Sequence, residues 1–281
     1  LLLGSASLDL LRQSGETLAG RIAYLELGPL NLLETGAASL DALWLRGGFP
    51  ESLTAASTAR SLRWRQNFIR SYLERDIAQF GSRIAADTLR RFWTMLAHHQ
   101  GGMLNVSQLA RNLGVDAKTA QSYLALLGAF LAPWHANAGK RLVKTPKHYV
   151  RDSGLVHALL GIETKESLLS HPVLGASWEG FCIENLLSCA SGQVEAFFYR
   201  TSAGAEIDLL LVWPNQQMWA IEIKRSLTPK VERGFHIACE DLKPTRQLVV
   251  YPGTESFPLS ANVQVISLPA LCQELVASTQ A

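Results

Sequence analysis

The feature that most constrains this chain is a pair of apolar, strand-like segments that carry several charged residues. The segments AEIDLLLVW and MWAIEIKRS are separated by PNQQ, a stretch typical of a turn. Side chains alternate along a strand, so Glu206 and Asp208 share one face of the first segment, and Glu222 and Lys224 share one face of the second. The pattern predicts an antiparallel hairpin that brings Asp208 close to Glu222 and Lys224.

Two interpretations of this hairpin are open. Periodicity alone favours a half-exposed hairpin, with its charges in solvent and with Ile221 and Ile223 in the core. The apolar surroundings favour a buried site instead, because an ionised carboxylate near a core is costly unless it is paired or bound to a metal.

A buried pair of Asp208 and Glu222 has the chemistry of a site for a hard divalent cation. Two carboxylates within close reach repel each other, and Mg²⁺ or Mn²⁺, which prefers oxygen ligands, removes that repulsion. Such an ion polarises a phosphate and lowers the pKa of a bound water. Lys224 would position that water or stabilise the charge that develops on a phosphate under attack.

The chain of 281 residues is long enough for two or three domains, and its patterns divide it into four regions. Residues 1–36 contain two strand-like runs around a helical segment, and residues 37–84 read as amphipathic helices. Residues 85–150 begin with a helix for which Asp87 is a candidate N-cap. Residues 151–281 alternate strands and helices, which predicts an α/β domain with a mixed sheet. The predicted fold class is therefore a multidomain α/β protein.

The third region contains LNVSQLARNLGVDAKTAQSYLALLGAF, which predicts a helix-turn-helix with Gly114 in the turn and Asp116 capping the second helix. The basic segment that follows predicts a β-wing, so residues 85–150 are expected to form a winged helix. Side chains of the second helix and the wing are suited to contacts with DNA phosphates. These are Lys118, Thr119, Gln121, Ser122, Lys140, Arg141, Lys144 and Lys147. A winged helix that only packs between domains is the alternative, because its second helix offers few base-reading groups.

Asp208, a spacer of 13 residues and then Glu222-x-Lys224 resemble the PD-(D/E)xK nuclease superfamily. The resemblance implies a helix followed by central strands, with Mg²⁺ or Mn²⁺ held by Asp208 and Glu222 and with Lys224 as a catalytic residue. The family's first helix often donates a further Glu. Here SWEGFCIENLL offers Glu179 and Glu184, and Glu179 fits the family's position better. The chain departs from the pattern in having isoleucine, not proline, before the Asp.

Seven segments in combination resemble a family of prokaryotic AAA-type ATPases with a C-terminal domain of unknown function. They are GSASLDLLRQSGETLAGRIAYLELGPLNLLE, LRGGFPESL, SYLERDI, KHYVRDSGLVHALLG, GASWEGFCIENLL, FYRTSAGAEIDLLL and AIEIKRS. The resemblance implies that residues 1–36 end a truncated ATPase core and that residues 37–84 are its helical lid. Ser5 would lie near the γ-phosphate, and Arg21 would sense it. For both, an ordinary role at a strand end or at the surface is the alternative.

The sequence contains no G-x-x-x-x-G-K-[ST] P-loop, so we expect ATP to bind only to an intact parent protein whose nucleotide-binding part lies upstream of Leu1. The four cysteines form no C-x-x-C pair, which favours reduced, buried thiols in a cytoplasmic protein. No apolar run is long enough for a membrane span. The net charge is only +2, so any contact with nucleic acid needs a local patch. AAA-type ATPases often form rings, which suggests a homo-oligomer.

Three hypotheses about function follow from these patterns. The first is a metal-dependent nuclease, with the catalytic set Asp208, Glu222, Lys224 and Glu179. The second is a non-catalytic module, in which the nuclease-like fold binds DNA or protein and the ATPase acts as a switch. The third is a purely structural hairpin. The nuclease hypothesis requires the carboxylates to converge in an open groove.

Overall fold

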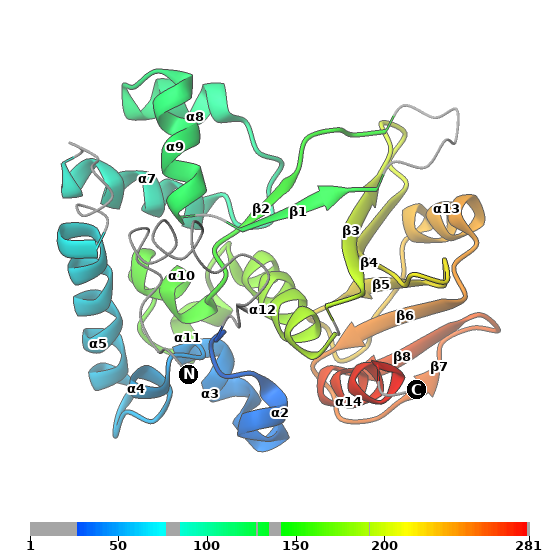
Figure 1. The fold of residues 1–281 in the computed structure, drawn as a ribbon. Coiled ribbons are helices and arrows are strands. Elements are labelled where there is room, and N and C mark those ends of the chain that lie inside the picture. Colours follow the sequence, from blue (N-terminus) through cyan, green and yellow to red (C-terminus); the bar gives the residue numbers. More distant parts are fainter. Residues whose placement is uncertain (1–26, 77–84, 128, 135–141, 191, 280–281) are drawn as a thin grey trace, which may run out of the picture.

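Figure 1 shows the fold of the chain in the computed structural model. The structure describes residues 27–76, 85–127, 129–134, 142–190 and 192–279. Ser5, Arg21, Lys140 and Arg141 lie outside these described residues. The first strand expected within residues 1–36 and most of the second, expected at residues 22–30, also lie outside them, and the described residues 27–30 are not in a strand.

The first half of the described chain is helical. Its helices are α2 (Leu32–Thr35), α3 (Leu40–Arg46), α4 (Pro50–Leu53), α5 (Thr58–Ser71), α7 (Ala86–His98), α8 (Val106–Leu113) and α9 (Ala117–Leu127), with the short turns η1 (Ala37–Ser39) and η2 (Tyr72–Asp76). The later helices are α10 (Ser153–Leu159), α11 (Lys165–Leu169), α12 (Leu174–Cys189), α13 (Arg233–Leu242) and α14 (Leu268–Thr279).

The predicted cap of α7 is wrong. The helix begins at Ala86 and its N-cap residue is Ala85, so Asp87 lies in the first turn and does not cap it. An acidic side chain is still favourable there, because it interacts with the positive end of the helix dipole.

The strands form one mixed sheet in the order β2-β1-β3-β4-β5-β6-β8-β7. Their bounds are β1 (Ala129–Pro133), β2 (Lys147–Tyr149), β3 (Glu195–Arg200), β4 (Glu206–Val212), β5 (Met218–Ile223), β6 (Arg246–Tyr251), β7 (Phe257–Pro258) and β8 (Val263–Ser267). The pairs β1–β3, β5–β6 and β6–β8 are parallel, and the other neighbours are antiparallel. The mixed sheet predicted for the C-terminal region is confirmed.

The helix pair α8–α9 and the two strands after it are also present where we expected them. Gly114 lies between the helices with a positive φ of 78°, and Asp116 accepts a hydrogen bond from the backbone N–H of Thr119. The strands β1 and β2 pair with each other in antiparallel fashion, but β1 also pairs with β3 of the large sheet. The sheet therefore crosses the domain boundary that we expected at residue 150.

Helices cover both faces of the sheet (Figure 1). On one face α12 and α14 pack in a large core that extends from Leu32 to Leu275 and includes the helical half of the chain. On the other face α13 packs in a smaller core. Because both faces are covered, the central strands are apolar almost throughout. All four cysteines are free and buried, as predicted.

No helix among the described residues has the length and apolarity needed to cross a membrane.

The carboxylate of Asp152 connects the loop after α3 to the start of α10. Asp152 caps α10 by accepting the N–H of Leu155 at 2.8 Å, and it also accepts the N–H of Gly48 at 2.8 Å. Gly47 has a positive φ of 79°, and a Cβ added there would overlap the Asp152 carboxylate. The loop after α3 therefore depends on glycine for both its conformation and its close approach.

We predict that Gly47→Ala destabilises the protein by on the order of 3 kcal/mol, because it adds overlap with Asp152 to the strain of a positive φ. Gly161→Ala is the matched control: its φ is also positive, at 70°, but no atom lies within 4 Å of an added Cβ. That variant should lose only about 1 kcal/mol. Urea unfolding of both variants measures the difference, and equal losses would contradict the proposed contact.

Candidate functional site

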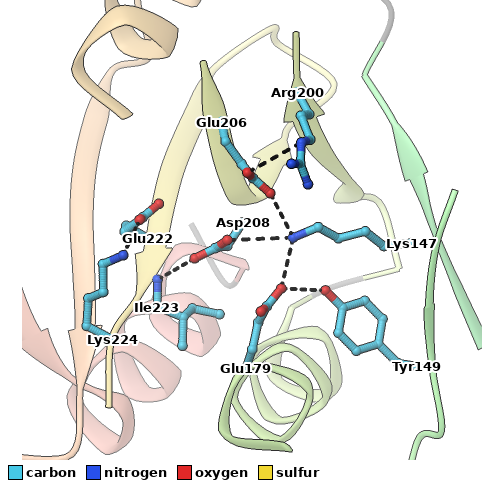
Figure 2. Close-up of polar contacts among 9 residues, drawn as sticks. All are labelled: Lys147, Tyr149, Glu179, Arg200, Glu206, Asp208, Glu222, Ile223 and Lys224. Carbon is cyan, nitrogen blue, oxygen red and sulfur yellow. Dashed lines mark hydrogen bonds and ion pairs between the residues drawn. The ribbon is translucent and has the colours of Figure 1, made fainter. Parts of the chain in front are cut away.

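The expected hairpin is formed by β4 and β5, which pair in antiparallel fashion. Their ladder runs to the pair Leu209–Ile221, so Asp208 and Glu222 stand at the next position, where the two strands begin to separate. The backbone N–H of Ile223 donates to Asp208 Oδ2 at 2.9 Å, as Figure 2 shows. The hairpin thus places both carboxylates at one end of the two strands.

These charges do not face solvent. Glu222 is only 7% exposed, and the side chain of Asp208 is 15% exposed. The interpretation of the hairpin as a half-exposed element with outward charges is therefore wrong. The hairpin is covered on both sides, and the carboxylates need partners within the protein.

The main partner is a lysine from a different strand. Lys147, the first residue of β2, lies with its Nζ 3.0 Å from Glu179 Oε1, 3.2 Å from Glu206 Oε1 and 3.6 Å from Asp208 Oδ1. Its side chain is 4% exposed. Figure 2 shows the ammonium group in the middle of these carboxylates, which come from α12 and β4. We call Glu179, Glu206, Asp208 and Glu222 the acidic centre.

Strand β2 also contributes a tyrosine to the acidic centre. The alternation of side chains puts Tyr149 on the same side of β2 as Lys147, and its hydroxyl donates to Glu179 Oε1 at 2.6 Å. The same carboxylate oxygen accepts from Lys147. Glu179 is therefore held in place by two donors from one strand.

Glu222 lies on the other side of Asp208 and pairs with Lys224 (Figure 2). The distance from Lys224 Nζ to Glu222 Oε1 is 2.8 Å. The second oxygen, Oε2, is buried and has no hydrogen-bond partner. A buried carboxylate oxygen without a partner is costly, so this atom marks a position suited to a further donor or cation.

The charges at the site shift the pKa values of its members. Burial by itself would lower the pKa of Lys147, but Glu179, Asp208 and Glu206 outweigh that effect and raise it well above the usual range, so the amine stays charged. Burial raises the pKa of Asp208, and the charges of Glu179 and Glu222 raise it further. Lys147 only partly offsets this shift.

The pKa of Glu222 is also raised by burial more than a neighbouring lysine lowers it. Burial raises its pKa, and the hydrogen bond and charge of Lys224 lower it only in part. Burial and the neighbouring carboxylates together outweigh the two lysines, so the pKa values of both central carboxylates stay raised.

The structure brings together Glu179, Asp208, Glu222 and Lys224, the four residues expected to form the catalytic set (Figure 2). The other candidate on α12, Glu184, pairs instead with Arg151, with an N–O distance of 3.1 Å.

Lys147 is a correction to the sequence analysis. We expected it on an exposed wing, where it would contact phosphates, but it is 3% exposed and its ammonium group is paired with carboxylates. Of the other expected contacts, Lys118, Gln121, Ser122 and Lys144 are exposed. Thr119 is half-buried, and its hydroxyl donates to Asp116 Oδ2 at 2.6 Å.

Sequence reasoning missed three members of the site. Glu206 shares a strand face with Asp208, so alternation could have included it. Lys147 and Tyr149 also share a face, but no local pattern shows that β2 lies beside α12 and β4. That neighbourhood depends on the pairing of β1 with β3.

No group of three His, Cys, Asp or Glu side chains within the described ranges is arranged to hold a metal ion. At the acidic centre the reason is visible in Figure 2: the oxygens of Glu179, Glu206 and Asp208 are directed at Lys147 Nζ. The carboxylates have the chemistry of metal ligands, but a lysine occupies the space between them. The open groove that the nuclease hypothesis requires is therefore filled by a side chain in this conformation.

Comparisons with known proteins match two regions of the chain. Residues 37–166 match the model of a Domain of unknown function (DUF8612), and residues 174–271 match the model of a Domain of unknown function (DUF4143). The first match covers helices α3 to α10 and strands β1 and β2, and the second covers α12 and the remaining sheet. Lys147 therefore lies in one matched region, and its three carboxylate partners lie in the other.

The chain is similar to uncharacterized proteins of Mycobacterium bovis and Mycobacterium tuberculosis. Each is 45% identical to it over 275 residues, which is 96% of this chain and 62% of the relative. The chain thus spans less than two thirds of the length of these curated relatives. No solved structure matches it.

The histidine between Lys147 and Tyr149 makes the attachment of β2 sensitive to acid. His148 is fully buried, neither of its ring nitrogens has a hydrogen-bond partner, and burial together with the charge of His99 lowers its pKa to about 4. A depressed pKa favours the neutral ring in the folded state. This stability is present above the ordinary pKa of about 6.5 and is lost as the pH falls towards 4.

We predict that the free energy of unfolding contributed by His148 falls by about 2 kcal/mol between pH 7 and about pH 5. His148→Phe should remove this loss while it keeps an aromatic ring in the core. The buried His157, whose pKa is also lowered to about 4, should lose stability in the same way in the parent chain and in the variant, so the comparison isolates His148. Urea unfolding at both pH values tests this. An unchanged pH dependence in the variant would show that His148 is not the titrating group.

Proposed function

We propose that the acidic centre is a divalent-metal-dependent, PD-(D/E)xK-type site that cleaves phosphodiester bonds in nucleic acid. The observation that carries this proposal is the convergence of Glu179, Asp208 and Glu222 from α12, β4 and β5, with Lys224 beside them. The order of helix and strands and the D-x13-ExK spacing support the same assignment. We further propose that the chain is the C-terminal part of an AAA-type ATPase, with a winged helix over residues 85–150.

The charge balance supports a divalent cation. The four carboxylates of the acidic centre outnumber the three cations paired with them, Lys147, Lys224 and Arg200, by one. Burial raises the pKa of Asp208 and of Glu222, and the neighbouring carboxylates raise it further. A bound cation would offset both effects, and carboxylate oxygens are the ligands that Mg²⁺ and Mn²⁺ prefer.

The chain's own residues would have separate roles. Asp208 and Glu222 would hold the metal, and the buried, unpartnered Oε2 of Glu222 is the clearest available ligand atom. The metal, when bound, would supply Lewis-acid polarisation of the phosphate and a more acidic water. Lys224 would position that water or stabilise the charge on the phosphate, and Glu179 would orient these groups or add a ligand.

The distribution of charge supports nucleic acid as the partner, and we propose DNA. Residues 58–122 contain ten lysines and arginines but only four aspartates and glutamates, although the whole chain has a net charge of only +2. Exposed cations on the helices of this region are Arg60, Arg63, Arg70, Arg90, Arg91, Arg111 and Lys118. A basic helical region in the same chain as an acidic site is suited to holding a phosphate backbone while the site acts on it.

A specific observation favours a second candidate function. The ammonium of Lys147 lies within 3.6 Å of three carboxylates and is almost fully buried. A lysine that permanently replaces the metal would leave a non-catalytic module that binds nucleic acid or protein and is moved by the ATPase. This candidate predicts neither metal binding nor cleavage.

We predict that the chain cleaves DNA in the presence of Mn²⁺ or Mg²⁺ and that Asp208→Asn and Glu222→Gln each reduce the rate at least a hundredfold, because each removes a ligand charge. Labelled single- and double-stranded DNA and RNA would be incubated with the purified chain, with chelator as the blank.

The matched control is Glu240→Gln, which neutralises an exposed acid on α13 outside the site and should keep the full rate. Absence of cleavage by both the parent chain and Lys147→Met at saturating metal would reject the catalytic proposal and favour the binding module.

A further inference from the structure

We propose that Lys147 is an intramolecular counter-ion that closes the metal position of the acidic centre, so that a divalent cation binds only when Lys147 leaves. This inference rests on the proposed metal site, and it assigns the regulation of that site. It requires β2, which pairs with β1 in this structure, to move away from the acidic centre when the metal binds.

The first argument is that Lys147 uses the atoms a metal would need. Its Nζ lies 3.0, 3.2 and 3.6 Å from oxygens of Glu179, Glu206 and Asp208. A hard cation in the same place would be bound by the same oxygens. Since an ammonium group and a divalent ion repel each other, they cannot share the position in a buried site.

The second argument is that the acidic centre is under-neutralised with Lys147 in place. One ammonium group serves three carboxylates, of which Glu206 has a second cation, Arg200, at 3.6 Å. Glu222 nearby pairs with Lys224 through one oxygen only, and its Oε2 has no partner. Three single charges therefore leave part of the repulsion between the four acids in place, whereas a divalent ion in the position of Lys147 would offset more of it. The exchange of Lys147 for a metal is thus electrostatically favourable at the centre itself.

The third argument concerns the strand that carries the lysine. β2 has only three residues and ends the order of the sheet, where it pairs with β1 through three residue pairs. On its other side it is bonded to residues 101–104: Gly101 N–H donates to the His148 carbonyl at 2.8 Å, and His148 N–H donates to the Gly102 carbonyl at 3.0 Å.

These two attachments belong to the same unit of the fold. Residues 101–104 lead directly into α8, and β1 follows directly after α9. β2 is therefore hydrogen-bonded on one side to the segment that precedes α8 and on the other side to β1, which follows α9. Under the proposal a shift of the helix pair carries β2 with it, and the pairing of β1 with β3 is the contact that such a shift has to accommodate.

The test is a comparison of Mn²⁺ affinity by titration calorimetry. Lys147→Met removes the ammonium group while it keeps an unbranched side chain, and it should bind Mn²⁺ at least tenfold more tightly than the parent chain. Lys144→Met removes an exposed lysine from the same segment and should leave the affinity unchanged. The double variant Lys147→Met/Asp208→Asn should lose the gain. Equal affinity of Lys147→Met and the parent chain would overturn the proposal.

A second measurement needs no variant and covers the case in which Lys147→Met does not fold. An amine-acylating reagent, followed by mass spectrometry, should leave Lys147 unmodified in chelator and modify it when the parent chain is saturated with Mn²⁺. Lys144 serves as the internal control and should react equally in both conditions. A Lys147 that stays protected with Mn²⁺ bound would overturn the proposal.

The two proposals fail separately. Tighter Mn²⁺ binding by Lys147→Met without any cleavage of nucleic acid would support the counter-ion and reject catalysis. Cleavage by the parent chain that depends on Asp208, together with no effect of Lys147→Met on Mn²⁺ affinity, would support catalysis and reject the counter-ion.

Discussion

A buried ammonium group requires carboxylates around it, and in this chain that requirement ties together three parts of the fold. Lys147 is almost fully buried and is paired with Glu179 of α12 and with Glu206 and Asp208 of β4. Loss of one partner from a buried set of charges usually costs more than the net gain from the pairs. Lys147 therefore connects the short strand β2 to helix α12 and to the central hairpin, and Tyr149 adds a second contact between β2 and α12.

The elements around the site could be predicted from sequence because local patterns determine them. The apolar runs on either side of PNQQ defined the β4–β5 hairpin, and strand alternation placed Asp208 near Glu222 and Lys224. Lys147 could not be placed in this way, because its environment depends on the parallel pairing of β1 with β3. A basic segment near a helix pair reads as a solvated wing unless that long-range contact is known.

The same long-range contacts explain why the chain does not divide cleanly at residue 150. β1 and β2 extend the C-terminal sheet, and Asp152 binds the loop after α3 while it caps α10. A large core then runs from the first described helices to α14. The helices and the sheet are packed as one unit, so an event in the helical half can change the geometry of the acidic centre.

The attachment of β2 to the segments on both sides of the helix pair has a consequence for binding equilibria. Residues 101–104 and β1 bond to β2 on its two sides and also flank the helix pair, so under the proposed exchange of Lys147 for a cation the occupancy of the acidic centre depends on the position of α8 and α9. A ligand that binds the helix pair only after it shifts would then change the affinity for the cation through this strand. Reciprocity then requires the cation to change the affinity for that ligand by the same factor. The free energy of this coupling can therefore be measured either from the cation affinity with and without the ligand or from the ligand affinity with and without the cation.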